Sequence, residues 1–330
     1  MSQITSNGDD LHLHIPERRI PIPKTISMEA QRALAMAGTR VSLPSTWPAR
    51  QDKAAWKEVI AAVDSQIAAL VAGLPAFPGS IVKRQVGKAT VFELTPPSIP
   101  EEKRDRAIIA LHGGGYMFGG GELAAKIHQV FALQSRTKVY AVDYRMPPDH
   151  PHPAALDDVV DAYRDVLERH KPGKVAMIGV SAGGGLVGTG ILKIRDLGLP
   201  LPGAAVMLTP STDLTESGDT FETNKYVDTT LVQRVPEMLS LYVGDHDPRD
   251  PYVSALYGDL SRGFPPTMLV SGTRDLLLSN TVLFHRALRR AGITAELHVF
   301  EALPHGVFGG APEDAESVEE QLRFIDRMLG

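Results

Sequence analysis

The chain of 330 residues contains no cysteine, which excludes thiol catalysis, disulfide bonds and cysteine-ligated zinc. It also lacks a basic patch, and its formal net charge is −5, so we expect no nucleic-acid partner. The N-terminal residues lack the basic-then-apolar pattern of a signal peptide, so the expected location is cytoplasmic.

One uncharged stretch, residues 175–192, has the length of a membrane span. It contains six glycines, together with the polar residues Ser181 and Thr189. A buried strand, turn and helix explain this composition better than a membrane helix does. We therefore expect no membrane insertion.

From about residue 80 the chain alternates short β-branched runs with helical patterns, which predicts an α/β fold. The first two strands have no helix between them and should pair antiparallel; the others should form a mostly parallel sheet with helices on both faces. The predicted strands are 81–86, 90–95, 107–112, 139–144, 175–180, 204–209, 267–272 and 296–301. The predicted helices are 122–135, 154–170, 182–196, 278–291 and 313–329.

Two regions fall outside this alternation. Residues 1–75 show helical patterns at 28–38 and 52–72 and no expected strand, and residues 211–245 show one helical pattern near 231–242. We interpret 1–75 as an N-terminal helical cap segment and 211–245 as a cap insertion. The catalytic domain is then 76–210 with 246–330. Ligands of open α/β sheets bind beyond the carboxyl ends of the strands, where such a cap would cover them.

The segment from Gly179 to Gly183 matches G-x-S-x-G, directly after a predicted strand and before a predicted helix. Such a sharp turn crowds the backbone on both sides of Ser181. The residues at positions 179 and 183 must therefore be small. The serine would stand at a helix N-terminus, where backbone N–H groups favour developing negative charge. The pattern predicts a nucleophilic serine.

The same segment allows a second interpretation. Gly183, Gly185 and Gly188 match the G-x-G-x-x-G dinucleotide fingerprint, and Asp213 lies about 25 residues further on, near the acidic position expected for a ribose. This interpretation gives Ser181 no role.

Other motifs favour acyl transfer. His112 and three glycines follow a predicted strand, and consecutive glycines can turn backbone N–H groups towards an oxyanion. An acyl-transfer serine also needs a histidine base oriented by a carboxylate. Asp275 and His305 each follow a predicted strand, in the order Ser, acid, His. Asp247 is the alternative acid, and His298, inside a strand, is a poorer base.

These motifs resemble the hormone-sensitive-lipase-like family of α/β-hydrolases, also called bacterial family IV esterases. The resemblance covers about residues 80–330. It rests on HGGGY at 112–116, DYRMPPDHPHPAALDD at 143–158, GVSAGG at 179–184, SGTRD at 271–275 and PHG at 304–306.

The resemblance implies the α/β-hydrolase fold and roles for six residues. The catalytic ones are Ser181 as nucleophile, His305 as base and Asp275 as the residue that orients the base. The oxyanion donors are the backbone N–H groups of Gly113, Gly114 and Ala182. Segment 143–158 would brace the sheet edge and start a helix. No metal or organic cofactor is implied.

The sequence also departs from the family. Members commonly have aspartate at the position of Val180, and often proline and a later acidic residue where this chain reads Leu276 to Asn280. These changes leave the catalytic groups intact and place the chain in a side branch. The stretch after Arg274 is similar to members described as lactone hydrolases.

We therefore expect a serine carboxylesterase that hydrolyses short- to medium-chain esters through an acyl-enzyme. A lactone hydrolase with the same triad is the alternative. A nucleotide-cofactor protein or a ligand-binding protein is a more remote alternative. Plant gibberellin receptors, which bind a ligand, resemble this family but have lost the triad histidine. This chain keeps that histidine as His305. The expected partner is a small ester or lactone, and the resemblance is compatible with a homodimer.

Overall fold

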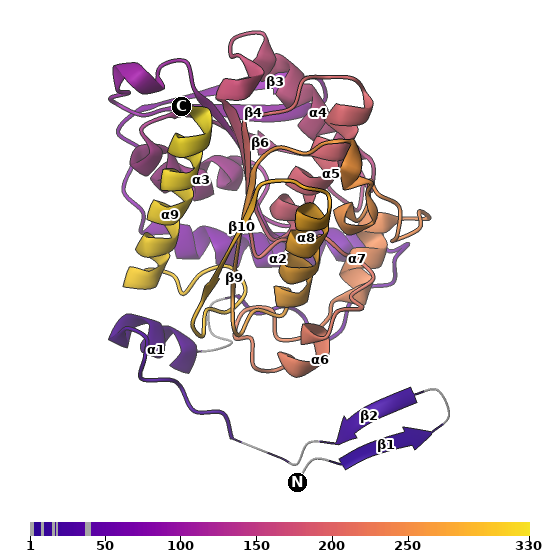
Figure 1. Cartoon of the computed structure of the whole chain (residues 1–330). Helices are drawn as coiled ribbons and strands as arrows, with labels where there is room; N and C mark the ends of the chain where they lie inside the picture. Colours follow the sequence, from indigo (N-terminus) through magenta and orange to yellow (C-terminus); the bar gives the residue numbers. More distant parts are fainter. Residues whose placement is uncertain (1–2, 8–9, 15–16, 18, 37–40) are drawn as a thin grey trace.

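The computed structural model describes residues 3–7, 10–14, 17, 19–36 and 41–330. Its centre is an eight-stranded sheet in the order β10-β9-β8-β7-β5-β6-β4-β3 (Figure 1). The strands are β3 (Ser80–Val86), β4 (Ala89–Thr95), β5 (Ala107–Leu111), β6 (Lys138–Asp143), β7 (Val175–Val180), β8 (Ala204–Leu208), β9 (Thr267–Gly272) and β10 (Ala295–Phe300). β4 is antiparallel to both β3 and β6, and the other neighbours are parallel. All eight predicted strands are confirmed, with ends within one residue.

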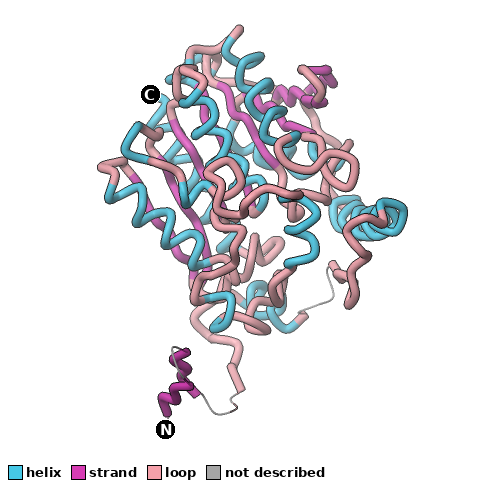
Figure 2. The backbone as a smooth tube through the Cα atoms, turned by 90° about the vertical axis from the view of Figure 1, so that its right-hand side faces the viewer, coloured by secondary structure: helices cyan, strands magenta, loops and turns pink. Residues whose placement is uncertain are grey.

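Helices cover both faces of this sheet, as Figure 2 shows from the side. On one face lie α4 (Ala154–Leu167), α5 (Ala182–Asp196) and α8 (Leu278–Arg290); on the other lie α3 (Glu122–Ser135) and α9 (Pro312–Leu329). Successive residues of β5 alternate between the two cores, Ile109 on one side and Ile108 on the other, and both are completely buried. A strand covered on both faces reads as an unbroken apolar run, which is why AIIAL predicts a central strand.

The remaining helices lie outside the sheet layers. They are α1 (Met28–Ala35), α2 (Lys53–Ala72), α6 (Thr220–Thr223) and α7 (Pro236–Val243), with short 3-10 helices at Glu101–Lys103, Pro172–Lys174, Ala255–Tyr257 and Leu260–Arg262. The Asp52 carboxylate caps α2 by accepting the N–H of Ala55, and buried Trp56 stacks on Trp47. In the described part of the chain, no helix combines the length and apolarity that crossing a bilayer requires.

Two expectations about residues 1–75 and 211–245 need correction. The helix expected near 231–242 is present but begins only at Pro236, because proline fits the first turn of a helix but disfavours helical geometry at the residue before it. Residues 1–75, expected to lack strands, contain the hairpin of β1 (Gln3–Asn7) and β2 (Asp10–His14), which lies away from the main sheet (Figure 1). The alternating pattern DLHLH and the Asn7-Gly8 pair are the signals that predict it.

An ion pair with a buried carboxylate fixes segment 143–158, which runs from β6 into α4. The backbone N–H and the guanidinium of Arg145 all donate to the carboxylate of Asp158, which is fully buried. The segment therefore braces the sheet edge and begins a helix, as the resemblance implies.

We predict that Asp158→Ala lowers the free energy of unfolding by about 1–3 kcal/mol, because it removes the buried acceptor of the Arg145 backbone N–H and of its partly exposed guanidinium. Unfolding in guanidinium chloride, followed by circular dichroism, measures this change. Asp161→Ala on the same helix is the control: its ion pair with Arg164 is exposed, and its removal should cost less than about 1 kcal/mol. Equal effects of the two variants would contradict the argument.

Candidate active site

Ser181 occupies a strained turn between β7 and α5. Its φ of 56° is rare for a residue with a side chain. A Cβ atom on Gly179 would lie 2.3 Å from the carbonyl oxygen of Gly183, and one on Gly183 would lie 2.1 Å from that of Leu111. Both flanking positions must therefore be glycine, for the steric reason that the sequence pattern suggested.

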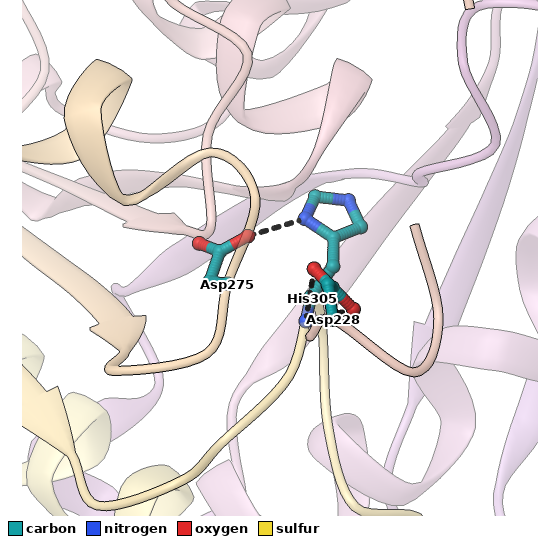
Figure 3. Close-up of side chains that lie close together, drawn as sticks. All are labelled: Asp228, Asp275 and His305. Carbon is teal, nitrogen blue, oxygen red and sulfur yellow. Dashed lines mark hydrogen bonds and ion pairs between the residues drawn. The ribbon is translucent and has the colours of Figure 1, made fainter. Parts of the chain in front are cut away.

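The structure brings together the three predicted side chains. His305 Nε2 lies 2.8 Å from Ser181 Oγ, and His305 Nδ1 lies 2.9 Å from Asp275 Oδ1 (the latter pair is drawn in Figure 3). The three residues follow β7, β9 and β10, whose carboxyl ends share one edge of the sheet. Asp275 is completely buried and also accepts hydrogen bonds from Ser271 Oγ and the Leu277 N–H.

The surroundings of His305 decide which of its nitrogens carries the proton. An ionised carboxylate only accepts hydrogen bonds, so Nδ1 donates to Asp275 and leaves Nε2 free to accept from Ser181. Burial lowers the pKa of His305, but the hydrogen bond to Asp275 and the negative charges of Asp275 and Asp228 outweigh burial and raise it. The imidazole is therefore ready to receive a proton at Nε2.

A further carboxylate beside the triad, Asp228, was not anticipated from the sequence. It accepts N–H groups from three segments: from Leu276 beside the acid, from His305 itself, and from Thr230 and Leu231 in its own turn. Burial raises its pKa to about 6, although the charge of His305 lowers it. Asp228 thus fixes the acid loop to the base loop. Its position between Val227 and Thr229 carries no motif that predicts this.

Asp228, Asp275 and His305 are also close enough to be considered as metal ligands (Figure 3). Their donor atoms are already engaged, since His305 Nδ1 and Nε2 contact Asp275 and Ser181, and the Asp228 oxygens accept backbone N–H groups. The arrangement fits a hydrogen-bonded triad rather than a metal site.

The predicted oxyanion loop begins directly after β5. A Cβ atom on Gly113 would lie 3.4 Å from the Cβ of Ser181, and Gly114 has a φ of 109°, which favours glycine. Within the described part of the chain, the N–H groups of Gly113, Gly114 and Ala182 have no hydrogen-bond acceptor. These donors remain free for a ligand next to Ser181.

His112 and Asp64 support this loop without entering the triad. Burial lowers the pKa of His112 to about 4, so the ring is neutral; it stacks on Tyr144, whose hydroxyl donates to the His112 carbonyl. Asp64, on α2, accepts the N–H of Gly119 at 2.8 Å. Helix α2 is therefore tied to the loop that carries the free donors.

The dinucleotide interpretation does not fit the structure. A Cβ atom on Gly185 would lie 2.3 Å from the Tyr116 hydroxyl, and one on Gly188 would lie 2.7 Å from the Ala255 side chain, so these glycines permit close packing within the protein. The Asp213 carboxylate is occupied by the hydroxyls of Thr215, Ser217 and Tyr257. Neither feature is available to a cofactor.

The two alternatives for the triad also lie elsewhere. Asp247 is in an exposed turn and accepts the N–H of Arg249. His298, in β10, pairs with Glu320 and Glu296. Neither contacts the Ser181 hydroxyl.

A cavity of about 350 Å³ opens over Ser181 and His305. Its walls come from the oxyanion loop, from the cap residues between 41 and 70, and from the segment between 211 and 239. Most of the lining is apolar, with Glu216 and Asp213 among the polar exceptions.

A serine, histidine and aspartate aligned on the carboxyl edge of a mostly parallel sheet define an α/β-hydrolase. A family model described as alpha/beta hydrolase fold matches residues 108–309, and the chain belongs to this family.

Similar proteins place the chain within the family. An acetyl-hydrolase of Streptomyces hygroscopicus is 33% identical over 271 residues, which cover 78% of this chain and 85% of that protein. Esterase LipI of Mycobacterium tuberculosis is 28% identical over 66% of this chain and 70% of its own.

Solved structures of esterases are similar to this chain along most of its length. The crystal structure of esterase E25 has a TM-score of 0.87 and 32% identity, covering 96% of this chain and 99% of that one. The crystal structure of an esterase from the bacterial hormone-sensitive lipase family has a TM-score of 0.78 and 28% identity, covering 92% and 99%. The expected hormone-sensitive-lipase-like branch is confirmed.

We predict that Asp275→Asn lowers the pKa of His305, because it removes the hydrogen-bonded charge that outweighs burial. Asp228→Asn should lower this pKa less, since Asp228 contacts only the backbone of residue 305. Nuclear magnetic resonance titration of the His305 imidazole measures both changes. Asp247→Asn, in a distant exposed turn, is the control and should leave the pKa of His305 unchanged. An unshifted His305 pKa in Asp275→Asn would refute this account of the site.

Proposed function

We propose that the protein is a serine carboxylic ester hydrolase that acts through an acyl-enzyme, with Ser181, His305 and Asp275 as its triad. The observation that carries the proposal is the chain of contacts of 2.8 and 2.9 Å from Ser181 Oγ through His305 to Asp275, at the floor of an apolar cavity. The esterase names of its relatives support the same reaction.

In the first half of the reaction, Ser181 Oγ attacks the ester carbonyl carbon while His305 Nε2 takes the hydroxyl proton. Asp275 stabilises the imidazolium that forms. The negative charge that develops on the carbonyl oxygen is held by the free N–H groups of Gly113, Gly114 and Ala182. The intermediate collapses, His305 returns the proton to the departing alcohol, and the acyl group stays on Ser181.

The second half repeats these steps with water. His305 takes a proton from a water molecule, the hydroxide oxygen attacks the acyl carbon, and the same donors stabilise the new oxyanion. Collapse releases the carboxylic acid and returns the proton to Ser181. Lactone opening would need the same groups, so lactones belong in the substrate panel.

The cap regions shape the substrate site. Residues 1–75 contribute Val41, Leu43, Val63, Ile67 and Leu70 to the cavity, and residues 211–245 contribute Leu231, Val235, Met238 and Leu239. These apolar walls favour small esters of short to medium acyl length, because burial of their methylene groups in the cavity is favourable.

We predict that Ser181→Ala reduces kcat for p-nitrophenyl butyrate on a scale of about 10⁶-fold, because the nucleophile is lost while the fold remains. A fluorophosphonate should label the wild-type protein at Ser181 and leave this variant unlabelled. Ser65→Ala, which changes an exposed serine on α2, is the matched control and should keep both properties. A correctly folded Ser181→Ala protein with near-normal turnover would disprove the assignment.

We predict that kcat/KM is higher for p-nitrophenyl butyrate than for p-nitrophenyl palmitate. Each buried methylene contributes about 0.8 kcal/mol of binding, but methylenes that extend beyond the cavity remain in water and contribute none. Initial rates at substrate concentrations below micelle formation give the comparison. Faster cleavage of the palmitate ester would show that the cavity continues into a longer acyl channel.

A further inference from the structure

Glu216 is an unusual member of the cavity wall. The residue lines the same cavity as Ser181 and His305, yet it is only 8% exposed. Its backbone has a φ of 51°, a left-handed geometry that costs free energy for any residue except glycine. Strain and a buried acid at one position of a substrate cavity suggest a role beyond packing.

Among the residues that the structure describes, none forms an ion pair with the Glu216 carboxylate. Its closest hydrogen bond is a long one, 3.4 Å from the N–H of Val235. The neighbouring cation, Arg234, donates through Nε to the backbone carbonyl of Glu216 and pairs through Nη1 with Glu222. The positive charge of Arg234 lowers the pKa of Glu216, whereas the negative charges of Asp213 and Glu237 raise it.

Asp213 provides an internal comparison, because it is also a buried acid on this cavity wall. Its two carboxylate oxygens accept hydrogen bonds from Thr215, Ser217 and Tyr257. Among the described residues, Glu216 has no such set of donors. Burial of a carboxylate without compensating donors is unfavourable, and here burial raises the pKa of Glu216 to about 7.

We propose that Glu216 is the recognition site for a positively charged group of the substrate, so that the cavity favours esters that carry an ammonium group. A bound cation supplies the direct ion pair that the described side chains do not make with this carboxylate, in a site shielded from water where such pairing is strong. This inference rests on the proposed ester hydrolysis for its kinetic consequences, but cation binding itself does not require the triad.

Two esters of equal shape test the kinetic consequence. One is 2-(trimethylammonio)ethyl butyrate, and the other is 3,3-dimethylbutyl butyrate, in which a neutral carbon replaces the ammonium nitrogen. At a pH of about 8.5, where Glu216 is mostly ionised, we expect the wild-type protein to have the higher kcat/KM for the cationic ester. In Glu216→Gln the ratio of the two values should fall about tenfold, which corresponds to about 1.4 kcal/mol.

Glu237→Gln is the matched control. It removes the same charge from the exposed first turn of α7, outside the cavity lining. It should leave the ratio of the two esters within about twofold of the wild-type ratio, since a solvated charge contributes little. An equal ratio in wild type and Glu216→Gln overturns the proposal, as does an equal fall in both variants.

A binding measurement separates this proposal from the proposed function. Calorimetry with hexyltrimethylammonium, a cation without an ester bond, is carried out on Ser181→Ala proteins with and without Glu216→Gln. We expect the Kd of the cation to rise about tenfold when Glu216 is replaced, and the Kd of neutral hexan-1-ol to change by less than about twofold. If neither ester is hydrolysed, the ester hydrolase proposal fails and this binding result alone decides the role of Glu216. An unchanged Kd for the cation overturns it.

Discussion

The site depends on one imidazole that bridges three strand ends. His305, after β10, contacts Asp275, after β9, and Ser181, after β7. Only parallel strands deliver the loops that follow them to the same edge, so the parallel order β10-β9-β8-β7 is the precondition for this contact. The antiparallel strands β3 and β4 lie at the opposite end of the sheet and contribute no triad residue.

Carboxylates of the two segments that we interpret as a cap hold loops at the edge of the sheet. Asp228 accepts the N–H groups of Leu276 and His305, and Asp64 accepts that of Gly119 in the oxyanion loop. In each case backbone N–H donors stabilise a carboxylate, which is buried for Asp228 and partly buried for Asp64. A movement of the cap would therefore move the groups around Ser181 as well as cover them.

The sequence predicts those features that local pattern determines. Buried parallel strands read as apolar runs, and the turn at Ser181 requires glycine at 179 and 183, so both can be recognised without coordinates. Asp228 and Glu216 could not be recognised, since their significance lies in contacts with residues distant along the chain. The hairpin of β1 and β2 has a local signal, namely the alternating pattern DLHLH and the Asn7-Gly8 pair. The helical patterns at 28–38 and 52–72 nevertheless favoured a helical N-terminal segment.

The triad residues and the residues of the cavity wall determine different properties: the reaction type and the choice of substrate. In the proposed mechanism Ser181, His305 and Asp275 act only on the reacting atoms and on one another, so they would serve any acyl transfer. Discrimination among esters must then come from groups that contact the rest of the substrate, and these belong mainly to residues 41–70 and 211–239. Among them, an apolar surface discriminates weakly, at about 1–3 kcal/mol per methylene, whereas a buried polar group without a partner discriminates strongly. The charge at Glu216 therefore has more influence on substrate choice than the larger apolar area around it.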